Sequence, residues 1–137
     1  MSNLNTTYDG IQHCTTIQED GGQTVGACAC KSLGGTGGGF SPIDLAGGAL
    51  ASCMLLAMGN VALRDKLDIA STRVDVEVAM TKEPAWRIGA IDLTVIMPNN
   101  FSSKDRIKLE RASDICPNKH TFHPDTSISS THFNYPE

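Results

Sequence analysis

The sequence predicts an α+β fold with mainly antiparallel sheets. Strand-like segments lie on both sides of one long uncharged segment, turn signals separate them, and a second helical segment precedes the last strand. The 137 residues, 14.6 kDa, fit one domain. We divide this expected single domain into an N-terminal β-hairpin (1–33), a glycine-rich connector (34–40) and a helix–sheet core (41–137).

The N-terminal part is expected to form a hairpin. Thr6–Ile17 is rich in threonine, isoleucine and tyrosine, as strands are. Glu19–Gly22 is a turn signal, and Thr24–Cys30 is predicted as the returning strand. Gly34–Gly39 follows and lacks the lysine and hydroxyl residues of a phosphate-binding loop. We interpret it as a mobile connector that lets the hairpin reach a partner subunit.

A long helix is predicted from Ser41 to about Lys66. Ser41 can cap it, Pro42 suits the first helical position, and Asp44 faces the positive end of the helix dipole. The segment Leu45–Leu63 carries no charge, and it is long enough to span a membrane. Glycine and polar residues dilute its hydrophobicity and no basic residue precedes it, so we expect no membrane contact. We expect a central helix covered partly by a second subunit, because so short a chain has few elements to wrap it.

The second half is predicted to form a sheet interrupted by a helix. Arg73–Val78 alternates between polar and apolar residues, and Arg87–Met97 alternates again. A second capping pair then opens a helix that ends near a cysteine–proline break, and one more strand follows. These features are Ser102 with Asp105, the helix end at about Ile115, Cys116-Pro117 with a short helix beginning at Pro117, and the strand Thr126–Phe133.

Composition excludes several classes of function. A net charge of −4 and a pI of about 5.5 argue against nucleic acid and against anionic membranes as partners. The five cysteines are odd in number and irregular in spacing, which does not fit a secreted disulfide framework. The polar start has no basic and apolar signal region. We therefore expect a cytoplasmic protein with free thiols.

Two cysteines have unusual settings. Cys53 lies inside the uncharged helix, and Cys116 lies at a helix break before proline. A reactive thiol needs thiolate, which a cation, hydrogen-bond donors or a helix N-terminus can favour. Spacing alone therefore favours an inert core cysteine at Cys53, in mid-helix.

The segment Gly37–Leu45 (GGGFSPIDL), continuing through Ala49–Cys53 (ALASC), resembles the central helix of the OsmC/Ohr family. These are the osmotically inducible protein C and organic hydroperoxide resistance proteins. The family also has an alternating strand pair and then a helix ending in Cys-Pro, as Ile115–Pro117 does here. The resemblance covers about Gly34 to Phe133 and implies an intertwined homodimer, with two central helices inside sheets from both chains.

The resemblance also implies a reaction. Peroxidase members of the family reduce organic hydroperoxides with a helix cysteine that becomes a sulfenic acid. A second cysteine converts it to an intramolecular disulfide, which an external dithiol reduces. Carried over, Cys53 is peroxidatic and Cys116 resolving, with no cofactor and no metal.

Two family features are missing. This chain has no arginine before Arg64 to activate the thiol from the N-terminal strands, and Ile43 stands where the peroxidases hold that arginine with a glutamate. The Ser-Pro-x-acid pattern is more similar to the divergent OsmC-like branch. Substitute cations could come from one of five residues, and the sequence does not choose among them: Lys31, His13, Lys119, His120 and His123.

Other functions stay open at this point. A non-catalytic OsmC-like protein could bind a small apolar ligand at the dimer interface. A thiol or zinc redox-regulatory protein is a further alternative: Cys116, His120 and His123 could supply three zinc ligands, although a structural site needs a fourth. Cys28 and Cys30, a C-x-C pair, and Cys14 have no assigned role.

Overall fold

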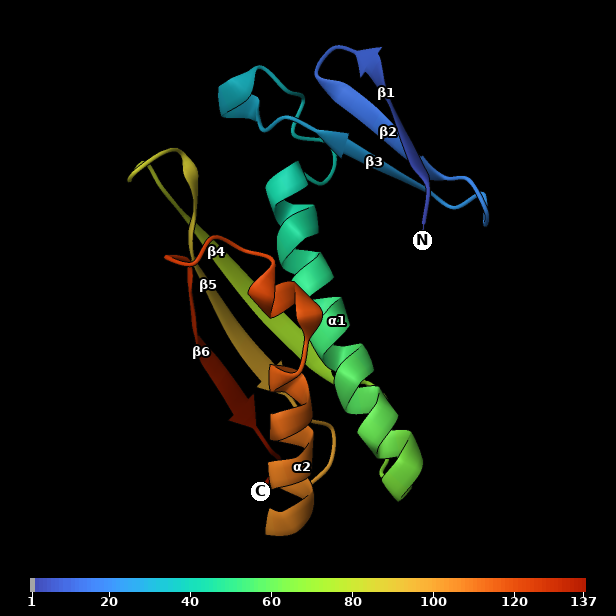
Figure 1. The fold of residues 1–137 in the computed structure, drawn as a ribbon, viewed down its shortest axis with the longest axis vertical. Helices are drawn as coiled ribbons and strands as arrows, with labels where there is room; N and C mark the ends of the chain where they lie inside the picture. The colour runs from blue at the N-terminus through green and yellow to red at the C-terminus, as the bar shows by residue number, and fades with distance from the viewer. Residues whose placement is uncertain (1) are drawn as a thin grey trace. The chain divides into compact units, whose positions relative to one another are not determined.

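The computed structural model describes residues 2–137 as two compact units, Met1–Ala46 and Gly47–Glu137. Figure 1 shows the order of the elements. The fold is α+β with three antiparallel strand pairings and one parallel pairing, so the predicted fold class is confirmed.

The first unit contains a three-stranded antiparallel sheet in the order β1-β2-β3, followed by a short 3-10 helix, η1. The predicted hairpin with its turn at Glu19–Gly22 is present as β2 and β3, but the prediction of one strand over Thr6–Ile17 is wrong. Gly10, Ile11 and Gln12 all have positive φ, and this tight turn divides the expected first strand in two. The dipeptide Asp9-Gly10 is a common turn signal between two strands, and it lies inside the segment that was predicted as one strand. The elements are β1 Leu4–Gly10, β2 His13–Gln18, β3 Thr24–Cys28 and η1 Lys31–Leu33.

Helix α1, Pro42–Asp65, begins with the predicted capping box. The amide of Asp44 donates to Ser41 Oγ at 3.0 Å, and the amide of Ser41 donates to an Asp44 carboxylate oxygen at 2.9 Å. These bonds satisfy two donors that a helix start leaves unpaired. The helix ends where Lys66 takes a positive φ of 57°.

The second unit holds a sheet in the order β4-β5-β6. β4 (Arg73–Thr81) pairs antiparallel with β5 (Arg87–Ile96), whereas β6 (Ser127–Asn134) pairs parallel with β5. The chain can return parallel because α2 (Ser103–Asp114) and the 3-10 helix η2 (Pro117–His120) form a long crossover. Ser102 Oγ accepts the amide of Asp105 at 3.2 Å, as predicted.

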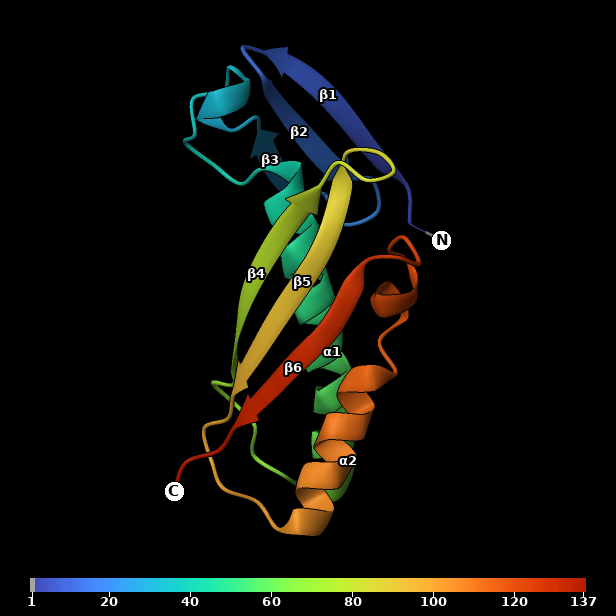
Figure 2. The ribbon, with the colours of Figure 1, turned by 90° about the vertical axis from the view of Figure 1, so that its left-hand side faces the viewer.

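Both helices lie on one face of the β4–β5–β6 sheet (Figure 2). Leu50, Met54 and Met58 on α1 are fully buried with Ile91 on β5 and Leu109 on α2. A Cβ at Gly47 would lie 3.1 Å from a Val78 methyl carbon, so a larger residue there would require the β4 side chains to shift by a few tenths of an ångström.

The opposite side of α1 is apolar and exposed. Leu56 is 73% exposed and Leu63 is 83% exposed. Of the helices that the structure describes, α1 is the one long and apolar enough to cross a membrane by length and composition, with a mean hydropathy of 1.6 in its most apolar stretch. The core helix of a soluble protein meets the same criterion.

Candidate functional site

Cys53 lies in the middle of α1 and is half-buried. It packs at the edge of the core formed by α1, α2 and β5. Of its two neighbours in the helix, Ser52 is exposed and Met54 is fully buried. The thiol therefore lies between the packed and the open sides of the helix, where a small molecule can reach it more easily than it can reach the core.

Cys116 lies between α2 and η2 and is completely buried. It is the N-cap residue of η2, with an extended backbone (φ −66°, ψ 120°), as predicted from the proline that follows. The backbone amide of Lys119 donates to the Cys116 carbonyl oxygen at 3.1 Å. The cysteine–proline break thus places the buried thiol at the start of a tight turn.

The structure brings Cys53 and Cys116 together. Both cysteines are free thiols, and Cys53 lies close enough to Cys116 to influence its pKa. Burial raises the pKa of the Cys116 thiol above its ordinary value, and the neighbouring Cys53 side chain raises it further, whereas the backbone of Lys119 and Asn118 opposes the shift. The fully buried Cys116 thus keeps its proton more readily than an ordinary thiol.

Two further contacts hold the elements that carry this thiol pair. Lys108 Nζ on α2 donates to an Asp65 carboxylate oxygen on α1 at 2.9 Å. Hydrogen bonds from Arg64 and Lys108 lower the pKa of Asp65 to about 2, so this carboxylate is charged at neutral pH. The Asn118 side chain on η2 donates to the carbonyl of Ala49 on α1 at 3.3 Å.

Comparison with known proteins places this chain in a family. The model of a family described as OsmC-like protein matches residues 35–131, a stretch that includes both cysteines. This chain belongs to the OsmC-like protein family. The resemblance noted from the sequence is confirmed.

Solved structures of OsmC-like and Ohr proteins have the same fold as this chain. A Psychrobacter arcticus protein, provisionally described as an osmotic stress induced and detoxification response protein, is 26% identical with a TM-score of 0.91. That match covers 98% of this chain and 96% of the other. An OsmC-like protein from Mycoplasma pneumoniae is 16% identical with a TM-score of 0.81, covering 100% and 98%. The organic hydroperoxide resistance protein OsmC from Legionella pneumophila is 18% identical with a TM-score of 0.75, covering 98% and 96%. No curated protein matched the sequence.

Three of the candidate activating cations lie in the same unit as the OsmC-like thiol pair. The Lys119 side chain is 13% exposed and pairs with Asp114 at 2.8 Å. His123 Nδ1 accepts the amide of Asp125 at 3.1 Å, and His120 is exposed. Among the described residues, no lysine, arginine or histidine side chain is hydrogen-bonded to either thiol.

The other two candidates lie in the first unit. His13 bonds Asp9 at 2.7 Å, and Lys31 is exposed with its aliphatic stem beside Gly37. The His13 side chain is thus paired locally, and the Lys31 side chain is exposed to solvent.

The remaining cysteines and the zinc hypothesis give no second site. Within residues 2–137, no three histidine, cysteine or acidic side chains are grouped so that they could hold a metal ion, and this includes Cys116 with His120 and His123. In the first unit Cys14 is half-buried, Cys28 buried and Cys30 exposed. A 3.0 Å hydrogen bond with Ser32 lowers the pKa of the Cys30 thiol, which makes it the thiol most able to compete with Cys53 for an oxidant.

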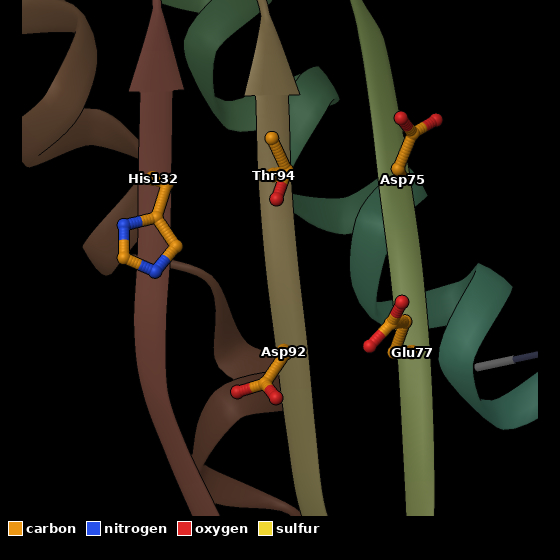
Figure 3. A pocket seen from close by; sticks show the side chains of 5 residues that line it. All are labelled: Asp75, Glu77, Asp92, Thr94 and His132. Atoms are coloured by element: carbon orange, nitrogen blue, oxygen red, sulfur yellow. The ribbon is translucent and has the colours of Figure 1, made fainter.

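A polar hollow of about 380 Å³ lies on the outer face of the β4–β5–β6 sheet (Figure 3). Sequence reasoning assigned nothing there, although strand alternation puts these side chains on the solvent face. Glu77 on β4 lies directly opposite Asp92 on β5, an unfavourable pairing of like charges. The lining residues are Asp75, Glu77, Asp92, Thr94 and His132.

Proposed function

We propose that this OsmC-like protein reduces organic hydroperoxides with its two thiols, Cys53 as the peroxidatic and Cys116 as the resolving cysteine. The observation that carries the proposal is the pair of neighbouring thiols, in which one member is completely buried and the other half-buried. Burial disfavours ionisation of Cys116, and Cys53 is the more accessible thiol, so we assign the attack on the hydroperoxide to Cys53. The Legionella relative is described as an organic hydroperoxide resistance protein, which supports the substrate class.

The proposed reaction has three steps. The Cys53 thiolate attacks the hydroperoxide oxygen, an S–O bond forms, the O–O bond breaks, and the alkoxide takes a proton to leave as alcohol. The Cys116 thiolate then attacks the sulfenic sulfur, which forms the disulfide and releases hydroxide, protonated to water. An external dithiol exchanges with the disulfide, becomes oxidised itself, and restores both thiols.

The proposal predicts a defined disulfide in the wild-type protein. One equivalent of cumene hydroperoxide should convert Cys53 and Cys116 into an intramolecular disulfide, and excess dithiol should give turnover. Mass spectrometry of unreduced peptides identifies the bond, and loss of hydroperoxide measures turnover. A protein that consumes no hydroperoxide and forms no such bond would contradict the proposal.

A second candidate is non-catalytic binding of a small apolar ligand at a dimer interface. The specific observation in its favour is that no cationic side chain of the described residues bonds either thiol. A hydroperoxide reaction requires a thiolate, and a guanidinium fork would stabilise one. The disulfide experiment separates the two functions, because ligand binding leaves both thiols reduced.

We also propose that the protein acts as a homodimer in the cytoplasm. The exposed face of α1 carries Leu56 and Leu63, together with Gly48, which has open space around its Cα. A second copy is the occupant that the OsmC/Ohr family resemblance implies, and small residues let two such helices approach closely. Free thiols are typical of a reducing compartment, which supports the cytoplasm.

Replacing Leu56 by glutamate should convert the dimer to a monomer, because a buried carboxylate without a partner is costly. Light scattering at micromolar concentration should give twice the chain mass of 14.6 kDa for the wild type and one chain mass for the variant. Ile107→Ser, which removes a half-exposed apolar side chain from α2, is the control and should stay dimeric. A monomeric wild type would refute the dimer.

A further inference from the structure

Asn118 contacts the helix turn that carries Cys53. Its side-chain Nδ2 donates to the Ala49 carbonyl oxygen at 3.3 Å. Ala49 lies one turn before Cys53 on α1, so the same carbonyl accepts the amide of Cys53 within the helix. A carbonyl oxygen has two lone pairs and can accept both donors. The Asn118 side chain is thus bonded to the peptide group that supports Cys53.

The same residue belongs to the turn that follows the other thiol. Asn118 lies two residues after Cys116, in the 3-10 helix η2 whose N-cap is Cys116. Asn118 therefore links the Cys53 turn, through its side chain, to the turn that carries the Cys116 thiol.

The other polar contacts of η2 are made with α2 or within its own turn. The Lys119 side chain pairs with Asp114 on α2, and the Lys119 amide donates to the Cys116 carbonyl. Among the hydrogen bonds of the described residues, the bond from Asn118 to Ala49 is the one that joins η2 to α1. Apart from packing, this side-chain bond is thus the contact of η2 with the helix that carries Cys53.

We propose that Asn118 is a positioning residue for formation of the Cys53–Cys116 disulfide, an inference that rests on the proposed function. The residue touches no substrate. It keeps the resolving sulfur beside the sulfenic sulfur while the S–S bond forms and hydroxide leaves, which raises the effective concentration of one group near the other. It is not needed for the attack of Cys53 on the hydroperoxide.

The test compares the two steps in Asn118→Ala. One equivalent of cumene hydroperoxide is added to the reduced full-length protein. Hydroperoxide loss reports the first step, and acid-quenched samples analysed by mass spectrometry report the disulfide. The first rate should be unchanged, and disulfide formation should slow about five- to tenfold, the effect of one net hydrogen bond. The equilibrium constant of the disulfide against dithiothreitol should fall by the same factor.

Two variants separate positioning from general destabilisation. Asn118→Leu keeps the side-chain volume without the donor and should reproduce the slower step. Asn99→Ala is the matched control, because Asn99 Nδ2 also bonds a backbone carbonyl, that of Asp68, at 2.9 Å between two loops. It should leave disulfide formation at the wild-type rate. Circular dichroism verifies that each variant is folded.

The outcomes distinguish the two proposals. Wild-type protein that forms a disulfide, with Asn118→Ala and Asn118→Leu forming it equally fast, overturns the positioning role alone. Equal slowing in Asn99→Ala overturns it as well, since the effect would then come from lost stability. Wild-type protein that forms no disulfide overturns the proposed function, and the positioning role with it.

Discussion

Cys53→Ser is expected to reduce hydroperoxide consumption to the background rate of the dithiol alone. Serine keeps the size of the side chain, but its hydroxyl does not ionise at neutral pH and does not form a sulfenic acid. The measurement is loss of cumene hydroperoxide with the dithiol in excess. Wild-type activity in this variant would remove Cys53 from the reaction.

Cys116→Ser should behave differently, because its loss affects only the second step. The first reaction with hydroperoxide should remain, and turnover with a dithiol should fall. The sulfenic acid at Cys53 has no neighbouring thiol to condense with, so it should persist and oxidise further to sulfinic acid. Peptide mass spectrometry would detect the gain of one and then two oxygen atoms on Cys53.

Cys30→Ser is the matched control for both variants. Cys30 is exposed, and its pKa is lowered by the hydrogen bond with Ser32, so it is the cysteine outside the pair best suited to react with an oxidant. If Cys53 is peroxidatic, Cys30→Ser should retain both hydroperoxide consumption and the Cys53–Cys116 disulfide. Loss of consumption in Cys30→Ser, or oxidation that falls first on Cys30 in the wild type, would reject the assignment of roles.

The parts of the fold that were predicted correctly depend on neighbouring residues. Ser41 with Asp44, and Ser102 with Asp105, satisfy helix-start donors three residues away, so their spacing alone identifies both helix starts. Pro117 predicts the short helix for a different local reason, because its fixed φ suits the first helical position. Strand alternation likewise predicts which residues of β4 and β5 face the helices.

The parts that were missed depend on distant residues or on an overlooked turn. The tight turn at Gly10 was missed because threonines on both sides favour a strand, and this masked the Asp9-Gly10 signal. The parallel pairing of β6 with β5 follows from how α2 crosses between them, which local propensity does not encode.

The approach of Cys53 to Cys116 likewise depends on residues that are distant in sequence. Residue spacing favours an inert Cys53, and only the family resemblance connects it to Cys116. In the fold, α2 packs beside α1 and η2 follows directly, so two cysteines distant in sequence become neighbours. The outer-face hollow is also built across three strands, so no single segment of the sequence indicates it.

Formation of the disulfide is expected to depend strongly on pH. The resolving step needs the Cys116 thiolate, and an ordinary cysteine, with a pKa of about 8.5, is only a few per cent thiolate at pH 7. Burial raises the pKa of Cys116 above that ordinary value. This cause persists when Cys53 is oxidised, because it belongs to the position of Cys116 in the fold. The thiolate is therefore scarcer than in a free cysteine throughout the neutral range.

Because the pKa of Cys116 is raised, the rate of disulfide formation should increase with pH. Below its pKa, a thiol gains about tenfold in thiolate for each pH unit, so disulfide formation should accelerate about a hundredfold from pH 6 to pH 8 and should still be rising at pH 8.5. Rapid quenching after one equivalent of hydroperoxide, with the sulfenic acid trapped by dimedone, measures this step apart from the first. A rate that levels off below pH 7 would mean that the backbone amides of Asn118 and Lys119 outweigh burial at the Cys116 sulfur. The assignment of Cys116 as the resolving cysteine would then lose its physical basis, because the buried thiol would no longer be one that keeps its proton at neutral pH.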